Sequence, residues 1–190
     1  PLNSSPKSKA EHKPSYTVKT DTVVANVPVQ NLVKLVDNPQ GLSPVGGGLW
    51  SAYRARTERL ENPSGAFVLY LGVEQAAIPE NCPPHLQFLY DYDGPVGENN
   101  SLFVSVSNPG DGRAPDGKAT LIASSCADIE RWDECSDDEY ARLKAEYTDQ
   151  AIAQLRSYFH LTPDTIVYQE AATPRSFVDF TGRDRGMVGG

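Results

Sequence analysis

The sequence predicts an α/β protein of the α+β kind, in which a mixed or antiparallel sheet is backed by helices. Four apolar or alternating runs, separated by Pro, Gly, Asn and Asp, are typical of strands joined by turns. A long stretch nearer the C-terminus carries apolar residues at helical spacing. With 190 residues, 39% of them hydrophobic, the chain can bury a core of roughly one domain.

Composition excludes several functional classes. The chain has 17 Lys and Arg against 25 Asp and Glu, for a formal net charge of -8, and no basic cluster. We therefore expect no nucleic-acid partner, because phosphate-backbone readers bind through clustered basic residues. The longest apolar run, Ala66 to Val73, is far shorter than the about 20 residues that cross a bilayer. No membrane-spanning helix is expected.

The first part of the chain predicts a strand-turn-helix unit. Residues 1–15 are expected to be a linker or disordered, because they are mostly Pro, Ser, Lys and Asn. Residues 16–48 form the predicted unit and a loop that ends in a Gly triplet. That triplet lacks the Lys and the preceding strand of a phosphate-binding loop, which favours a hinge. The predicted elements are an edge strand at 17–20, a buried strand at 22–27 and a helix at 29–36 after Pro28.

The middle of the chain, from 49 to 170, begins with a short helix at 49–60 and then predicts an antiparallel meander. The four strands of the meander are expected at 66–73, 86–90, 101–106 and 119–124. In the third strand, Phe103 stands on an otherwise polar face. We expect this ring either to line a cavity or to pack under a neighbouring helix.

The clearest helix is predicted over residues 137–159. Ser136 and Glu139 fit a capping box, and acidic residues occupy the first turn, where the helix dipole favours them. The apolar stripe of this helix consists of Tyr140, Leu143, Tyr147, Ile152, Leu155 and Phe159. A last strand is expected at 165–169, and Pro174 is placed to open a short helix.

Catalysis by side chains alone has no good candidate in this sequence. The three cysteines have no CxxC spacing and are expected to be reduced, and the three histidines are not at metal-ligand spacing with them. We therefore expect no metal. The carboxylates from Asp128 to Glu139 are typical of a solvated run that caps a helix, and no G-x-S-x-G motif is present. If the protein is an enzyme, a cofactor is expected to carry the chemistry.

Several segments resemble the phytoene-dehydrogenase-like flavoproteins. The family-wide pieces are Ala-Thr-Pro-Arg-Ser-Phe at 172–177 and Phe-Thr-Gly-Arg at 180–183, and the longer stretches at 63–73, 77–88 and 108–118 indicate the subgroup. Within the family, these stretches are most similar to the cyanobacterial-type carotenoid 3',4'-desaturases, with the carotenoid isomerases as the sister group. The likeness extends from about residue 20 to residue 190.

The resemblance implies an FAD-linked protein of two domains. Residues 16–48 then look like a return through the FAD domain, 49–170 like the substrate domain, and 171–190 like a segment that leads back to the flavin. The family's G-x-G-x-x-G motif and its acidic ribose-binding residue are absent. Because the only Met, Met187, lies near the end of the chain, we expect an internal or C-terminal fragment, inactive by itself.

For the complete enzyme, the resemblance implies desaturation of a carotenoid polyene by hydride transfer to FAD. Carotenoids dissolve in bilayers, so the enzyme is expected to be cytoplasmic and peripheral on a membrane. Two alternatives remain open on the sequence: cis-trans isomerisation of a carotenoid, and a non-enzymatic carotenoid- or lipid-binding module. A third, an amine-oxidase-like enzyme acting on a polar amine, is disfavoured by the carotenoid-type middle stretch.

The same resemblance implies a set of residues near the substrate and the flavin. The residues are Thr173, Pro174, Arg175, Phe177, Gly182, Gly186 and Gly189. Arg175 is equally expected to be a structural salt-bridge partner, and the glycines to serve tight turns. Phe177 and Phe180 are expected to line a substrate tunnel or, alternatively, to pack in the core.

Overall fold

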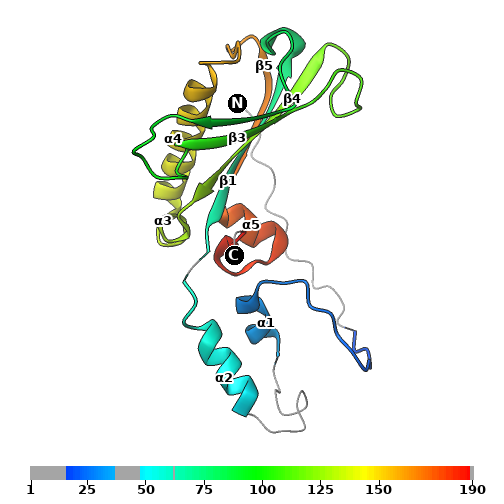
Figure 1. The fold of residues 1–190 in the computed structure, drawn as a ribbon, viewed down its shortest axis with the longest axis vertical. Coiled ribbons are helices and arrows are strands. Elements are labelled where there is room, and N and C mark those ends of the chain that lie inside the picture. Colours follow the sequence, from blue (N-terminus) through cyan, green and yellow to red (C-terminus); the bar gives the residue numbers. More distant parts are fainter. Residues whose placement is uncertain (1–15, 37–47, 62, 189–190) are drawn as a thin grey trace.

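The computed structural model describes residues 16–36, 48–61 and 63–188. Its larger part is a sheet with a long helix on one face, and two short helices lie beyond the lower end of the sheet (Figure 1). The expectations for residues 1–15, for most of the Gly-rich loop and for Gly189 lie outside the described residues. The α+β class predicted from the sequence is confirmed.

The sheet has five strands in the order β2-β3-β4-β1-β5, and every neighbouring pair is antiparallel. The strands are β1 (Gly65–Glu74), β2 (His85–Leu89), β3 (Ser101–Val106), β4 (Lys118–Ala127) and β5 (Ile166–Ala172). Only β2, β3 and β4 form the predicted meander, and β1 pairs with β4 and β5 instead of β2. The reason is burial: β1 is largely apolar on both faces and is buried most completely in the interior of the sheet, between β4 and β5.

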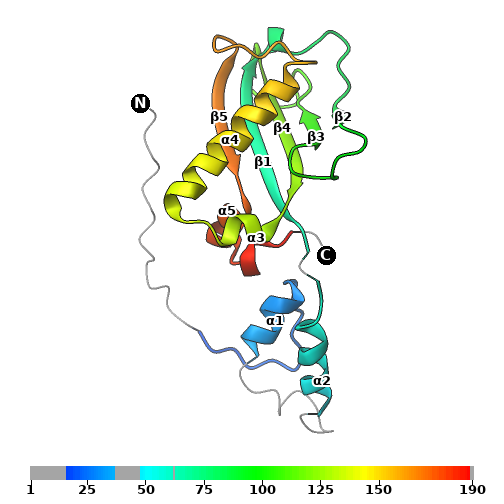
Figure 2. The same cartoon turned by 90° about the vertical axis from the view of Figure 1, so that its left-hand side faces the viewer.

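One face of the sheet is covered by α4 (Asp137–Leu155), with α3 (Ile129–Asp133) at its lower end (Figure 2). The predicted capping box of Ser136 and Glu139 is present, and the apolar stripe of α4 packs on the sheet. The helix ends at Leu155 and not at Phe159, because the chain turns there, although Phe159 is still buried. The core therefore lies between α4 and this face.

At the lower end of the sheet, β5 leads directly into α5 (Pro174–Thr181). Pro174 occupies the first turn of α5, as predicted, because the backbone N–H that proline lacks has no hydrogen-bond partner within the helix at this position. β5 itself runs to Ala172, three residues beyond its predicted end at 169. A short 3-10 turn, η3 (Asp184–Gly186), follows α5.

The N-terminal segment contains two helices, α1 (Val29–Leu35) and α2 (Gly48–Thr57), close to their predicted positions. The strands predicted at 17–20 and 22–27 are wrong, because both stretches are irregular and exposed. A β-branched run becomes a strand only where another strand pairs with it. The two edge strands of the described sheet, β2 and β5, lie apart from these residues (Figure 2).

Candidate functional site

The turn between β5 and α5 holds most of the residues predicted to lie near a flavin. Thr173 caps α5 and is fully buried, and its backbone N–H donates to Ser176 Oγ at 3.1 Å. Its hydroxyl is hydrogen-bonded to the hydroxyl of Tyr140 on α4 at 2.9 Å. The side chain of Thr173 thereby ties the start of α5 to the helix that covers the sheet.

Pro174 is packed between two glycines that approach it because they have no side chain. A Cβ on Gly65 would lie 2.7 Å from Pro174 Cγ, and a Cβ on Gly186 would collide with the Pro174 carbonyl oxygen. Gly186 also has a φ of +75°, a conformation that glycine adopts without strain. In this structure, Gly186 therefore serves the close packing of the turn against α5.

Arg175 makes its contacts with the start of α4 and the end of α3. Its Nε donates to the Trp132 carbonyl at 2.9 Å, and an Nη donates to the Cys135 carbonyl. Its guanidinium pairs with Asp137 at 3.2 Å and lies 4.7 Å above the centre of the Tyr140 ring. These are the contacts of a structural bridge. A role of Arg175 beside a flavin stays a prediction.

The remaining predicted residues lie further along α5. Phe177 is half-buried, whereas Phe180 is 89% exposed, so core packing of Phe180 is wrong in this structure. Gly182 ends α5 with a φ of +66°, and a side chain there would meet open space. The structure brings Thr173, Pro174, Arg175 and Gly186 together, and leaves Phe180 and Gly182 at the surface.

The turn after α5 is held by α1, although the two segments are about 150 residues apart in sequence. Asn31 Nδ2 donates to the Gly182 carbonyl at 2.8 Å, and its Oδ1 accepts from the Asp184 N–H at 2.8 Å. Lys34 pairs with the Asp184 carboxylate at 2.6 Å. The predicted return segment and the predicted flavin-approach segment are therefore in direct contact.

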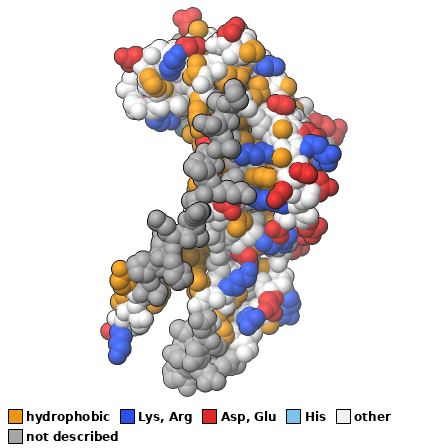
Figure 3. All heavy atoms as spheres, turned by 180° about the vertical axis from the view of Figure 1, so that it is seen from behind, with side chains coloured by type: hydrophobic (Ala, Val, Ile, Leu, Met, Phe, Trp, Pro, Cys, Tyr) orange, Lys and Arg blue, Asp and Glu red, His pale blue; other side chains and the backbone are white. Residues whose placement is uncertain are grey.

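The sheet face opposite α4 carries no helix from the described residues, and we call it the open sheet face (Figure 2). Charged side chains gather instead on the side of the molecule that carries α4 (Figure 3). The large apolar and aromatic side chains on the open sheet face are Tyr70, Leu89, Phe103, Ile122 and Tyr168. Tyr70 and Ile122 are direct neighbours across β1 and β4.

A groove of about 600 Å³ lies on the open sheet face. Its floor includes Tyr70 and Ile122, and Tyr168 of β5 lines one side. Gly72 leaves room for Tyr168 in the groove, since a Cβ at position 72 would lie 3.1 Å from Tyr168 Cβ. The loop at 113–115 walls the groove.

The charged groups around the groove are paired with one another. Tyr168 donates its hydroxyl to the Glu170 carboxylate, and this bond raises the pKa of the phenol. Lys118 pairs with Glu74. In the wall loop, the Asp111 carboxylate accepts from Arg113, which lowers its pKa to about 2. The groove can therefore accept an apolar molecule without leaving an ion unpaired.

Sequence reasoning missed this groove and selected Phe103 instead. Phe103 is 45% exposed and its ring stacks on His85 at 5.7 Å, so it does not pack under a helix of the described residues. Its other expected role, lining a cavity, stays a prediction. The sequence did contain a signal for the groove. On the outward-facing positions of the two long strands, Tyr70 and Ile122 are large residues among small or polar neighbours. That signal needs the pairing of β1 with β4, which the sequence did not predict.

The strand-to-helix junctions β4–α3 and β5–α5 do not fit a dinucleotide phosphate. At the start of α3, the carboxylate of Asp128 accepts from the Glu130 N–H and would repel an anion. At the start of α5, Pro174 has no N–H, and the Thr173 N–H is already bonded. Neither junction offers the free N–H groups that a pyrophosphate requires. The described residues therefore do not fit FAD by themselves.

Among the described residues, no helix combines the length and the apolar character needed to cross a bilayer. No group of three or more His, Cys, Asp or Glu that could hold a metal ion occurs within the described ranges. The three cysteines are free thiols, as the sequence predicted.

Comparison with known proteins finds similarity to plant prolycopene isomerases. No family model matches the chain. Over 127 residues, or 64% of this chain, it is 29% identical to prolycopene isomerase 1, chloroplastic, of an Oncidium hybrid cultivar, and 28% identical to the prolycopene isomerases of Arabidopsis thaliana and Daucus carota. The chain spans about a fifth of the length of these relatives.

Proposed function

We propose that this chain is part of a carotenoid-processing enzyme of the phytoene-dehydrogenase-like family. The similarity to prolycopene isomerases supports the substrate class, and the sequence motifs at 172–177 and 180–183 support the family. In this proposal, residues 49–170 belong to the substrate domain, 16–48 to a return through the FAD domain, and 171–190 to the segment that leads back to the flavin.

The observation that carries the proposal is the groove on the open sheet face. Its floor is apolar and aromatic, its charged rim is internally paired, and no described helix covers it. A polyene has no hydrogen-bonding groups along its chain, so apolar burial is the main contribution available for binding it. We assign this groove to one stretch of the carotenoid chain.

The reaction we propose first is desaturation, with FAD as the hydride acceptor in the complete protein. Because neither strand-to-helix junction fits a pyrophosphate, we assign FAD binding to sequence outside the described residues. The described residues would bind and shield the polyene, which excludes water from the reacting bonds. Peripheral contact with a membrane, on its cytoplasmic side, remains part of the proposal because the substrate dissolves in the bilayer.

Isomerisation is a second candidate, and one observation favours it directly. The relatives found by comparison are named prolycopene isomerases. The same groove serves either reaction, since both act on the same kind of polyene. The two candidates differ in the mass of the product and not in the binding surface.

The experiment expresses the full-length gene that contains this segment in a carotenoid-producing host, with pigments analysed by absorption spectroscopy, chromatography and mass spectrometry. A red-shifted product two hydrogens lighter supports desaturation. An unchanged mass with altered cis-trans composition supports isomerisation. No change in any pigment contradicts both, and bound pigment without turnover then identifies a binding module.

A matched pair of variants tests the groove itself. Ile122→Trp fills the floor and should lower the rate of carotenoid conversion about tenfold or more. Leu89→Trp adds the same bulk on the open sheet face but outside the groove, and Leu89 is as exposed as Ile122, at 38% against 37%. This control should retain activity. Equal losses in both variants would contradict the assignment of the groove.

A further inference from the structure

The strand β5 lies at one end of the sheet and pairs only with β1 among the described residues. In an antiparallel strand, every second residue points its backbone N–H and C=O away from the existing partner. Natural edge strands are commonly protected by Lys or Pro, and β5 contains neither. Among the described residues no strand pairs with its outer edge, so this edge can accept another strand.

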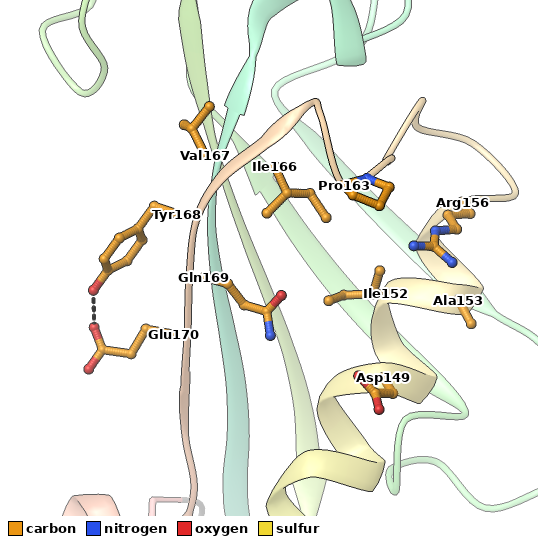
Figure 4. Close-up of a pocket in the computed structure, with 10 residues that line it drawn as sticks. All are labelled: Asp149, Ile152, Ala153, Arg156, Pro163, Ile166, Val167, Tyr168, Gln169 and Glu170. Atoms are coloured by element: carbon orange, nitrogen blue, oxygen red, sulfur yellow. Dashed lines mark hydrogen bonds between the residues drawn. The ribbon is translucent and has the colours of Figure 1, made fainter. Parts of the chain in front are cut away.

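A groove of about 970 Å³ runs beside this edge, between β5 and the second half of α4 (Figure 4). Gln169 and Ile166 point from β5 toward α4, and Tyr168 and Glu170 lie on the other side of the strand (Figure 4). The groove is lined on this side by Asp149, Ile152 and Ala153 of α4 and by Arg156, which caps the C-terminal end of the helix. In order along the helix, these are an acid, two apolar residues and a base.

This order is self-complementary under two-fold symmetry. Asp149 and Arg156 are seven residues apart, about 10.5 Å along the helix axis, which is too far for an ion pair within one chain. When two α4 helices run antiparallel about a point between Ile152 and Ala153, each Asp149 faces the Arg156 of the other chain. The small side chain of Ala153 stands near the axis, and Nε of Arg156 is anchored on the Leu161 carbonyl at 2.9 Å.

The sequence of β5 allows the same symmetry. Antiparallel pairing of two β5 strands centred on Gln169 places Tyr168 opposite Glu170 of the other chain and Glu170 opposite Tyr168. Centring the pair on Glu170 would instead place two carboxylates opposite each other, which destabilises a sheet. Gln169 also projects toward Ile152 and Ala153 in Figure 4, so the strand centre and the helix centre lie at the same level of the groove.

We propose that the β5 edge and the adjoining α4 groove bind a second copy of this chain. The two sheets join into one antiparallel sheet of ten strands, twice the five of one chain. Each copy presents the same surface, as a closed two-fold interface requires. Two Asp149–Arg156 ion pairs flank the axis, one on each side. The inference is independent of the reaction catalysed.

Charge exchange tests the interface in the full-length protein, with self-association followed by sedimentation velocity. Asp149→Lys places two bases together across the axis, and Arg156→Glu places two acids together. Each variant should weaken dimerisation about tenfold or more, because like charges meet at the interface. The double variant restores opposite charges and should recover most of the affinity. A purely structural role for either residue would show no such recovery.

Cysteine cross-linking gives a second readout. Gln169→Cys puts two thiols opposite each other at the axis, where paired Cα atoms of antiparallel strands lie about 4.5 to 5.5 Å apart, within disulfide range. Tyr168→Cys is the control, since its direct neighbour across the axis is Glu170. Mild oxidation should cross-link the first variant and neither the second nor the parent protein, which already has three free thiols.

Three results would overturn the proposal. A full-length protein that stays monomeric at high concentration has no such interface. A monomer in which the β5 amides that point away from β1 are protected from hydrogen exchange would show that a strand of its own chain covers the edge. Failure of the double charge variant to recover the affinity, with both single variants impaired, would place the dimer interface elsewhere.

Discussion

The sheet with α4 and the N-terminal segment differ in how their helices are held. The main hydrophobic cluster of the described residues lies between Phe67 and Ala171, and α4 contributes a full apolar face to it. In contrast, α1 has no buried residue, and its Leu35 is 66% exposed. Both helices were predicted from the same 3.6-residue periodicity. Periodicity therefore predicts that a helix forms, whereas burial depends on what packs against it.

The contact between the two regions is polar and small. Asn31 and Lys34 bind the turn at 182–184, and a cleft of about 980 Å³ between the two regions is lined by both. Polar contacts at an exposed site contribute little net free energy. We therefore expect the sheet region to carry nearly all of the unfolding free energy, with α1 opening locally at much lower cost.

The largest difference in stability is expected between variants of two leucines, one in each region. Leu155→Ala removes a fully buried side chain of α4 and should lower the unfolding free energy by about 2 to 5 kcal/mol. Leu35→Ala in α1 should change it by about 0.5 kcal/mol or less. Urea denaturation followed by circular dichroism measures both. Similar losses in the two variants would mean that α1 shares the core.

Two arginines, one in each region, allow the same comparison of unfolding free energies with a smaller expected difference. Arg175→Met leaves the Trp132 and Cys135 carbonyls without their donor and should cost about 1 to 3 kcal/mol of unfolding free energy. Arg54→Met removes an exposed ion pair between α2 and Glu58, the residue after this helix, and should cost about 0.5 kcal/mol or less. Thermal melts of the two variants and the parent protein measure the difference. A large effect at Arg54 would contradict it.

Much of the fold was predictable because its signals are local. The capping box at Ser136, the Pro174 helix start and the alternation of β3 were each read from a few adjacent residues, and the structure contains all three. The pairing of β1 with β4 and β5 was not predictable, because strand order depends on contacts between residues far apart in sequence. The failed strands at 17–20 and 22–27 have the same cause.

The candidate site divides in the same way. The motif at 172–177 led to the turn around Thr173 and Arg175, where several predicted residues do meet. The groove beside Tyr70 and Ile122 was missed, because it is formed by three strands and a loop that the sequence could not order. Asn31 was also missed, since its two bonds join segments about 150 residues apart.

A smaller effect is expected at the start of α4. Ser136→Ala removes the cap of the helix and should cost about 1 kcal/mol of unfolding free energy at neutral pH. The Ser136 hydroxyl and N–H both hold the pKa of Glu139 below its usual range. The ionised carboxylate is therefore favoured in the folded state, and this contribution is present above the usual pKa of Glu and is lost as the pH falls below it.

The measurement for Ser136→Ala is the difference in unfolding free energy between variant and parent at pH 7 and at pH 3. The difference should shrink at the lower pH, because the advantage of the ionised Glu139 carboxylate is lost as the pH falls through its lowered pKa. The neighbouring variant Asp138→Asn, which changes a first-turn acid outside the capping box, is the control. A difference that grows on acidification would show that Glu139 does not favour its ionised form in the fold.

The smallest global effect is expected where the two regions meet. Asn31→Ala removes both bonds to the 182–184 turn, and because one of them is exposed and the other only partly buried we expect a loss of about 0.5 kcal/mol in unfolding free energy. The local effect should be much larger. Hydrogen exchange of the Asp184 amide and of the α1 amides should speed up, while exchange of the β1 and β4 amides stays unchanged.

Gln30→Ala, one residue away on α1, is the control and should leave the Asp184 amide protected. Faster exchange throughout the sheet of Asn31→Ala would show that the two regions unfold as one cooperative unit, and that α1 is held by more than these polar contacts.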